Sequence, residues 1–435
     1  MAAETITSLD RVLKEYYPAG GIVNQLNIDT FLLDKVEKAK RFQNVGGRYL
    51  YKPARFGLSG AVGPRAEDTA LPTPQTATFD DIQIPIKFHY GVVQVTGPVM
   101  AVSKSDKHAF AEALALTMDG MYDEFRLVAN IMLYGWSSGI LGVVSSVSGA
   151  VITLKDDINP INWFYEGQRL SVYDSDEVTI DAGVTDPINV TDVNLVDKKI
   201  TVNSGTSIDA NDVLVIASGL NNAPEGLLST IDDSTYKTTY FGISRSTRSR
   251  WKSFVSPAAP TKYGALAASR RAITGNLLQT ALDSQRVRAG ASRPIDQIIS
   301  SLGVRRAYWN SLSPDRRFDS AIYDGGWEML KYSNGDRTIP WFGDEFCPRY
   351  TLFGLYTGTV PAGKGKKSDK IQDEEVLAIY EALAPDWDSS TGSEMKQVYS
   401  GAAFVDSVGA FLKWYFNFGS CRPNVHMRVD DLLES

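Results

Sequence analysis

The sequence predicts an α+β protein in which a small all-β domain interrupts a larger fold. Three observations carry this prediction: a β-patterned ribbon without a core of its own, one long stripe of apolar residues at helical spacing, and a β-patterned segment that repeats itself. The chain has 435 residues, of which 43% are hydrophobic and 22% are charged. This composition is typical of globular proteins and excludes collagen, wholesale disorder and a short disulfide-stapled module.

The beginning of the chain is predicted to form an arm followed by a solitary β-ribbon. Pro18 and the glycines after it break any helix that begins nearby. Two β-patterned segments follow, from Arg48 to Leu58 and from Ile82 to Thr96. The tip between them, Ser59 to Asp81, is rich in Gly, Pro and Thr. Because it has almost no large apolar residue, it must be solvated or docked on a neighbour.

A long helix is predicted from Asp106 to about Tyr134. A capping signature begins at Ser103, and Gly135 ends the helix. Its length of about 40 Å, at the usual rise per residue, suits a spine. The apolar stripe consists of Phe110, Leu114, Met118, Met121, Phe125, Val128 and Met132.

The segment from residue 141 to 219 is predicted to be an inserted β-domain. The β-pattern from Val144 to Val172 recurs from Val190 to Ile216, at an offset of about 44 to 48 residues. Two similar three-strand units can close on each other as a barrel or sandwich, which removes free sheet edges. The segment holds twelve acids against four bases, so we expect a solvated acidic face.

Beyond Gly219 the interrupted fold is expected to resume. Helices are predicted over Lys262–Arg286, Gly303–Leu312 and Glu374–Leu383. Strands are predicted over Ile295–Ser301, Glu328–Tyr332, Thr338–Phe342 and Tyr350–Leu355, and the late stretch Gly401–Asn417 is apolar and rich in aromatics.

Basic residues gather between Lys237 and Arg317, where fifteen bases stand against three acids. Tight phosphate binding favours a compact basic face, whereas these residues are spread along the segment. The spread favours ion pairs across protein interfaces. A nucleic-acid-binding protein that uses this segment remains a lesser alternative.

No metal or cofactor site is predicted. The three histidines are scattered, and the two cysteines, Cys347 and Cys421, lack metal-ligand spacing and are expected to be buried and unpaired. No stretch is apolar enough to span a membrane, and the N-terminus does not read as a signal peptide. We therefore expect a soluble protein made in a cytoplasm.

Two motifs suggest chemistry, and both stand in an unfavourable context. Gly135 to Gly139 matches the G-x-S-x-G pattern of a serine hydrolase with Ser137 as nucleophile, but a helix precedes the serine where a strand is needed, and only His426 could follow as base. Gly358 to Gly365 is similar to a phosphate-binding loop, but glycine replaces the magnesium-binding hydroxyl residue. We interpret the first as a helix-ending turn and the second as a basic surface loop.

The order of these features resembles that of tailed-phage major capsid proteins of the Hong Kong 97 type. The shared order is an arm, a protruding β-ribbon, a long helix that ends at Leu133 to Gly135, a Ser137 to Gly139 turn and a β-insertion. The resemblance covers essentially the whole chain and continues through Glu225–Leu227, Gly242–Arg245, the strand at Ile298–Ser301 and Cys421–Pro423.

This resemblance implies a division of the chain. Residues 1–47 would be the N-terminal arm, 48–96 the extended β-loop, 97–140 and 220–300 the peripheral domain with its spine helix, 141–219 the inserted β-domain, and 301–435 the axial domain with a C-terminal return to the peripheral domain.

The resemblance also implies a function. The chain would be a non-enzymatic capsid protein without cofactors, made in the host cytoplasm, whose copies assemble through pentamers and hexamers into an icosahedral virion shell around double-stranded DNA. Scaffold, portal and decoration proteins would be further partners, the DNA would be touched weakly and without sequence preference, and no membrane would be involved. The alternatives are the shell protein of an encapsulin-like cellular compartment and the Ser137 hydrolase.

The resemblance further implies that the apolar residues of the ribbon are buried between subunits, and we expect nearby arginines at the same contacts. These residues are Tyr49, Tyr51, Arg55, Phe56, Ile84, Ile86, Phe88, Arg245, Arg248 and Arg250.

Overall fold

The computed structural model describes residues 30–36, 49–96, 107–184, 186–203, 207–257, 260, 262–264, 269–312, 331–333, 338–357, 376–387, 396–400 and 403–434. Its helices are α1 (Phe31–Lys35), α3 (Lys107–Tyr134), α4 (Leu227–Thr230), α5 (Gly275–Ala289) and α6 (Leu302–Ser311). Among the described residues, no helix combines the length and the apolar character needed to cross a membrane. The predicted arm outside residues 30–36 and the Gly358 to Gly365 loop lie outside the described residues.

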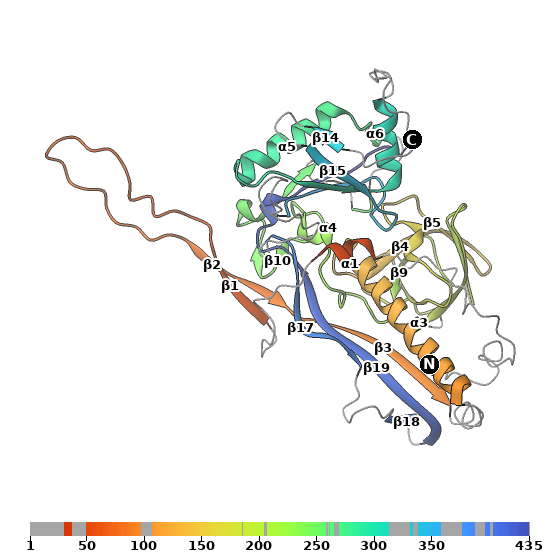
Figure 1. Cartoon of the computed structure of the whole chain (residues 1–435). Coiled ribbons are helices and arrows are strands. Elements are labelled where there is room, and N and C mark those ends of the chain that lie inside the picture. The colour runs from red at the N-terminus through yellow and green to blue at the C-terminus, as the bar shows by residue number, and fades with distance from the viewer. Residues whose placement is uncertain are drawn as a thin grey trace.

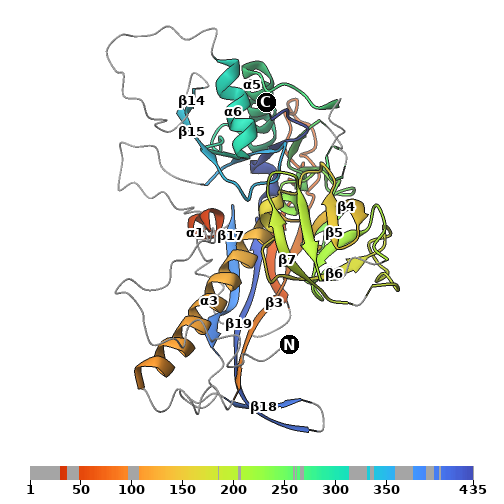
Figure 2. The same cartoon turned by 90° about the vertical axis from the view of Figure 1, so that its right-hand side faces the viewer.

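A long sheet and the helix α3 form the lower part of the molecule (Figure 1). The sheet consists of β3 (Lys87–Thr96), β17 (Ala378–Trp387), β18 (Lys396–Ser400) and β19 (Ala403–Gly419). Both β3 and β17 pair antiparallel with β19, and α3 lies along one face of the sheet in both views (Figures 1 and 2). Gly91 allows the close approach of α3, because a Cβ atom there would stand 2.9 Å from the Met121 sulfur. Helix α3 begins at Lys107, one residue after the predicted start, so the predicted spine helix is confirmed.

A six-stranded mixed sheet forms the upper part of the molecule in Figure 1. Its order is β12 (Phe254–Ser256), β20 (Met427–Val429), β16 (Leu352–Leu355), β13 (Gln297–Ser300), β15 (Thr338–Gly343) and β14 (Lys331–Ser333). Helices α5 and α6 bury Leu278 and Val304 in its core, and the Tyr308 ring stacks on Trp341 at 4.7 Å. Since β20 comes from the end of the chain, this core joins segments far apart in sequence.

The inserted segment folds as a closed barrel. Its strands are β4 (Ile140–Ser148), β5 (Val151–Leu154), β6 (Arg169–Tyr173), β7 (Ile188–Asn194), β8 (Lys199–Val202) and β9 (Val213–Ile216), in the closed order β4-β5-β8-β7-β6-β9. Val144, Ile152, Leu170, Ile200 and Leu214 are fully buried. The two repeated units of the sequence correspond to β4-β5-β6 and β7-β8-β9, and the predicted all-β closure is confirmed.

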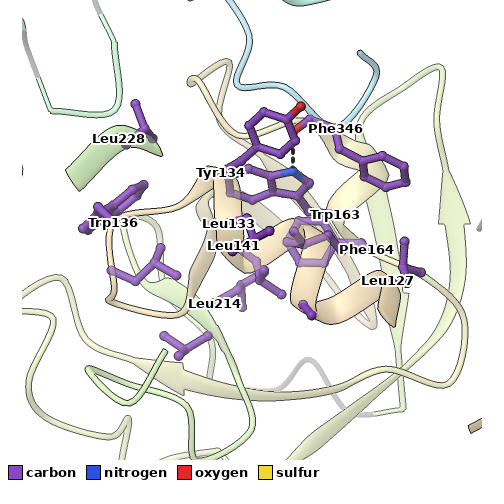
Figure 3. Packing of buried hydrophobic residues seen from close by; sticks show 14 of the residues in the cluster. Leu127, Leu133, Tyr134, Trp136, Leu141, Trp163, Phe164, Leu214, Leu228 and Phe346 are labelled. Carbon is purple, nitrogen blue, oxygen red and sulfur yellow. Dashed lines mark hydrogen bonds between the residues drawn. The ribbon is translucent and has the colours of Figure 1, made fainter. Parts of the chain in front are cut away.

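The core of the molecule is continuous between the end of α3 and the barrel (Figure 3). Leu133, Tyr134 and Trp136 pack there with Trp163, which lies on the short helix η2 (Ile161–Trp163) of the insertion. The Trp163 indole donates to the Phe346 carbonyl at 2.9 Å, which is the bond drawn in Figure 3. The barrel is therefore docked on the body by apolar packing and by hydrogen bonds.

The ribbon projects from the other side of the molecule (Figure 1). Strand β1 (Tyr49–Arg55) pairs antiparallel with β2 (Phe79–Pro85), and the loop between them, residues 56–78, extends away from the body. We call these 23 residues the protruding loop. The segment predicted as one strand from Ile82 to Thr96 is divided near Ile86, because β2 pairs with β1 whereas β3 pairs with β19.

Two sequence predictions of helices are wrong. The segment predicted as a helix up to Leu383 forms β17 from Ala378, because its backbone pairs with the long strand β19. The helix predicted from Lys262 begins only at Gly275, where the Thr274 hydroxyl accepts a hydrogen bond from the Leu277 N–H at 3.2 Å. The remaining described parts of the predicted helices and strands match α6, β13, β14, β15 and β16.

Candidate functional site

The inner face of the β1–β2 ribbon is anchored in the subunit. Leu50, Ile82 and Ile84 are buried in a cluster with aromatic residues of the hairpin β10 (Thr239–Tyr240) and β11 (Ile243–Ser244) and of β17. The members from the body are Tyr240, Phe241, Ile243, Trp251, Ala378, Tyr380 and Cys421. The prediction that Ile84 contacts another subunit is therefore wrong, since the alternation of β2 turns this side chain into the chain's own core. Ile86 is half-buried beside the same cluster.

An ion pair and a ring contact fix the start of the protruding loop. The Arg248 guanidinium donates two hydrogen bonds to Asp80, at 2.6 and 3.1 Å. Phe56 is half-buried and meets Trp251 edge-on, with ring centroids 5.7 Å apart. Arg248 and Phe56 thus have roles within the subunit, and their contact with a neighbour remains a prediction.

The outer side of the ribbon and the protruding loop leave large apolar side chains uncovered. Tyr51 and Phe79 are about three-fifths exposed, at 60% and 61%, and Tyr49 is exposed as well. On the loop, Val62 is 93% exposed and Leu71 is 85% exposed, and Leu58 is also exposed. Several exposed large apolar residues on a loop that extends from the body are typical of a segment that another molecule covers.

A second aromatic surface lies on the face of the long sheet opposite α3. Phe88, Tyr90 and Val92 of β3 are exposed there because every second residue of the strand points away from the helix. The Tyr415 ring of β19 meets Phe88 at 5.0 Å and Tyr90 at 5.8 Å, both nearly at right angles. Phe88 thus belongs to a different surface from the protruding loop.

Arg245 lies in the interior, so its predicted contact with another subunit is wrong. Its side chain is fully buried and pairs with Asp232 at 3.3 Å. It also donates to the carbonyls of Ser229, Thr230 and Lys237, at 2.7, 3.0 and 3.0 Å. Burial lowers the pKa of Arg245, and Asp232 counteracts this shift. The carbonyl acceptors and the carboxylate together offset the cost of burying the charge.

Other arginines of the basic segment also bond inside the subunit. Arg270 pairs with Asp156 of the inserted segment at 2.8 Å, and Arg288 donates to the Ser253 carbonyl at 2.8 Å. Several arginines of the basic segment therefore form their bonds inside the subunit, and the prediction of ion pairs between subunits applies only to the others.

The remaining predicted residues, Arg55 and Arg250, are both exposed and line one groove at the base of the ribbon. This groove has a volume of about 370 Å³ and is also lined by Lys52, Arg293 and Arg422. We call it the basic groove. Sequence reasoning missed it because its cations come from separate segments, and no local pattern brings residue 293 or 422 to the ribbon.

The geometry at Ser137 does not provide a nucleophile. Ser137 is buried, and its hydroxyl donates to the Ala223 carbonyl at 3.0 Å. His426 lies between the Val376 carbonyl at 2.9 Å and the Tyr356 N–H at 3.3 Å, so both ring nitrogens face the backbone. The hydrogen-bond chain that a hydrolase needs from serine to histidine is therefore not formed by these residues.

Metal-ligand and cysteine chemistry gain no support from the described part of the chain. No group of three or more His, Cys, Asp or Glu side chains there is arranged to hold a metal ion. Cys347 and Cys421 are both buried and lie in different hydrophobic clusters.

No family model and no curated protein match the chain. Among solved structures, a chain of the cyanophage A-1(L) capsid matches with a TM-score of 0.54 and 15% identity, covering 96% of this chain and 95% of that one. The capsid of a native GTA particle matches with a TM-score of 0.48 and 11% identity, covering 99% and 100%. The holo-SrpI encapsulin complex from Synechococcus elongatus matches with a TM-score of 0.40 and 8% identity, covering 100% and 98%.

The fold assignment rests on the cyanophage chain, which has the highest TM-score of these three and is covered nearly from end to end. The match includes both the long sheet with α3 and the six-stranded sheet, since 96% of this chain is aligned. The chain therefore has the α+β fold of phage capsid proteins, as the order of its sequence features predicted.

Proposed function

We propose that this chain is a major capsid protein whose copies assemble through pentamers and hexamers into a closed icosahedral shell around double-stranded DNA. The observation that carries the proposal is the protruding loop, which exposes Leu58, Val62 and Leu71 on a subunit with the phage capsid fold. An enzyme would place its specific side chains in a concave site, whereas these uncovered residues belong to a loop that extends away from the body (Figure 1).

The energetics favour a repeated contact between copies. Burying one large aliphatic side chain stabilises a complex by roughly 1.5 to 3 kcal/mol before the ordering of the loop is subtracted. One loop alone therefore gives a weak association. A contact between two different surfaces of identical copies repeats around a ring, and the weak energies add over a closed lattice.

The proposal includes the cellular setting and the partners. The chain is a non-enzymatic component of the virion and is made in the host cytoplasm. Scaffold, portal and decoration proteins are the further partners that we propose besides copies of this chain. The packaged DNA is touched weakly and without sequence preference, which agrees with the use of several arginines inside the subunit.

Electron microscopy of negatively stained, purified full-length protein, with sedimentation velocity on the same sample, tests this proposal. We expect closed shells, or rings of five and six copies. A triple variant carries Leu58→Ser, Val62→Ser and Leu71→Ser together, which preserves the length of the loop and removes its large apolar side chains. Because these residues are exposed, we expect the triple variant to keep the circular dichroism spectrum of the wild type but to form far fewer particles.

A monodisperse wild-type monomer that persists with crowding agents and candidate scaffold proteins would contradict the proposal. Particles that protect a protein cargo and no DNA when isolated from their natural source would instead support the encapsulin-like alternative.

A further inference from the structure

Residues 431–434 follow β20 and lie at one end of the six-stranded sheet, and we call them the strap. Leu432 of the strap is fully buried in the hydrophobic cluster of that sheet. Its N–H donates to the Tyr350 carbonyl at 3.0 Å, and the Leu433 N–H donates to the Arg271 carbonyl at 2.8 Å. Backbone hydrogen bonds therefore hold the strap on two segments of the body that are far apart in the sequence.

The strand register brings distant residues together at this end of the sheet. Ser300, the last residue of β13, pairs with Leu352, the first residue of β16. Leu352 also pairs with Val429, the last residue of β20. The residues next to these three positions, Ser301, Tyr350 and the strap, therefore meet at the same end.

The Glu434 carboxylate of the strap is enclosed by hydrogen-bond donors. Its Oε1 accepts from the Ser301 hydroxyl at 2.5 Å and from the Tyr350 N–H at 3.2 Å. Its Oε2 lies 3.2 Å from Nε and 3.1 Å from Nη2 of Arg349, and the side chain is only 11% exposed. Gly303 of α6 makes room for it, because a Cβ atom there would stand 2.6 Å from the Glu434 Cβ. A guanidinium, a hydroxyl and a backbone N–H around one space favour a carboxylate.

The inserted barrel is held at the same place by Asp156. Arg349 donates to its Oδ1 at 2.8 Å, and the Tyr350 hydroxyl donates to the same oxygen at 2.6 Å. Arg270 pairs with its Oδ2 at 2.8 Å. Three residues of the body thus hold one carboxylate of the insertion.

The strap is bonded to each of these three residues or to its direct neighbour. The Arg349 guanidinium lies between the carboxylates of Asp156 and Glu434. Tyr350 is bonded to the strap through both its N–H and its carbonyl. Arg270 precedes Arg271, whose N–H donates to the first carbonyl of the strap at 2.6 Å and whose carbonyl accepts from Leu433. The strap therefore orients the side of the body that receives the barrel.

We propose that Ser301, Arg349 and the Tyr350 N–H form a carboxylate-binding site, and that Glu434 bound in this site fixes the inserted barrel to the body. The filled site holds the Arg349 guanidinium in the orientation that pairs with the barrel. When the site is empty, the guanidinium and the Tyr350 backbone each lose a partner, and the junction with the barrel opens more often. This inference goes beyond the proposed function, because it concerns a single subunit and does not depend on assembly.

Hydrogen exchange of the full-length chain, measured by mass spectrometry, tests this role. Two amides of the junction report on it: the Ile158 N–H donates to the Tyr263 carbonyl at 3.1 Å, and the Arg349 N–H donates to the Ile158 carbonyl at 2.6 Å. We expect Glu434→Ala to raise the exchange rate of both amides by at least about tenfold, since exchange follows local opening. The Val190 N–H inside the barrel should keep its rate, because the barrel stays closed.

Free acetate separates a carboxylate site from a packing role. Glu434→Ala removes a group that matches acetate, so an excess of acetate should restore slow exchange at the junction. Acetamide, and chloride at the same ionic strength, should not. Glu434→Gln fills the site with a neutral group, so exchange should rise and acetate should not correct it. The matched control, Asp192→Ala, removes an exposed acid of β7 and should leave both amides unchanged.

Asp156→Asn tests whether the strap acts through this contact with the barrel. Alone it should raise the exchange of the same two amides, and adding Glu434→Ala should raise it little further, because both changes open one contact. Additive effects of the two changes would overturn this coupling.

Two further outcomes would overturn the carboxylate site itself. One is wild-type exchange in Glu434→Ala, and the other is faster exchange on which acetate and acetamide act equally. If Glu434→Ala does not fold, Glu434→Gln decides the question, because it preserves the volume of the side chain. Wild-type exchange in Glu434→Gln would then contradict the inference.

Discussion

The inserted barrel and the protruding loop leave the body of the molecule in different ways. The barrel closes its six strands on one another, and its core residues Val144, Leu170 and Ile200 have no exposed surface. The loop has one pair of strands at its base and leaves Val62 and Leu71 almost fully exposed. The barrel encloses an apolar core of its own and exposes large apolar residues such as Val178 and Val196 only outside its strands, whereas the loop has no enclosed core beside its exposed residues.

This difference concerns closure more than composition. The barrel is the acidic, polar part of the chain and is nevertheless self-sufficient, because closure removes every free edge. The ribbon is self-sufficient only at its base, where Ile82 and Ile84 meet the body. Under the proposed function, the protruding loop is the part of the described chain that a neighbouring copy would cover.

Removing the protruding loop is expected to have the largest effect on assembly and a small effect on the subunit. The change replaces residues 58–77 by a short Gly/Ser turn and keeps Asp80 and Ile82, which anchor the ribbon. We expect a folded subunit that forms no closed shells, measured by thermal melting and by electron microscopy. Normal shells from this variant would show that the loop has no role between subunits.

Two matched leucine substitutions, one in the barrel and one in the loop, compare how much each region contributes to the free energy of unfolding. Leu170→Ala in the barrel removes a fully buried side chain and is expected to cost about 2 to 5 kcal/mol of the free energy of unfolding. Leu71→Ala on the loop is expected to change it by less than about 0.5 kcal/mol, since this side chain is exposed. Urea unfolding of the dissociated subunit measures both, and equal losses would refute the comparison.

Asp157 makes the stability of the barrel junction depend on pH. It is buried beside the insertion's η2 helix; its Oδ1 accepts from the Asn159 N–H at 3.0 Å, while burial raises its pKa to about 7. An unfolded aspartate titrates near pH 4, so the contribution of the neutral form is complete below about pH 4 and is lost as the pH rises to about 7.

Asp157→Asn should remove this dependence. We expect the variant to be more stable than the wild type above pH 7, by about 2 to 4 kcal/mol, and close to it below pH 4. Urea unfolding at a series of pH values measures the difference. A difference that is constant with pH would assign it to packing instead of ionisation.

The neighbouring Asp156 is expected to behave in the opposite way and with a smaller effect. Partial burial alone would raise its pKa, but hydrogen bonds from Lys198, Tyr350, Arg270 and Arg349 hold the pKa well below its usual range. Its contribution is therefore present above about pH 4 and is lost as the pH falls further.

Asp156→Asn should reduce stability near neutral pH by about 1 kcal/mol, because the carboxylate is half exposed and water screens its ion pairs. The loss should disappear in acid, which the same pH series of unfolding curves measures. A loss that persists in strong acid would mean that the asparagine disturbs the packing of Tyr350.

The parts of the fold that were predicted correctly are marked by a residue pattern within one continuous stretch of the sequence. The stripe from Met118 to Met132 has helical spacing, and α3 ends at Tyr134, immediately before the predicted Gly135 stop. The repeat between Val144 and Ile216 indicated two equivalent strand units, and these units form the barrel. Closure of the barrel could be predicted because each three-strand unit has unpaired edge strands that can pair with those of the other unit.

The parts that were missed depend on partners far away in sequence. The segment around Ala378 has apolar residues compatible with a helix, and only its pairing with β19 makes it a strand. Arg245 has the appearance of a surface residue until Asp232 and three carbonyls surround it. The basic groove brings β1 together with residues 293 and 422, and no pattern in the sequence predicts that these segments lie close together.

The connection between the barrel and the body has a practical consequence. Gly139 and Gly219 lie so close that a Cβ atom on Gly139 would stand 2.8 Å from the Gly219 carbonyl oxygen, and the Asn221 N–H donates to the Ser138 carbonyl at 2.9 Å. The chain thus leaves and rejoins the body through one narrow neck. A foreign domain whose two ends lie equally close together can be joined at this neck, provided that it also covers the apolar surface of the body on which Trp163 now packs.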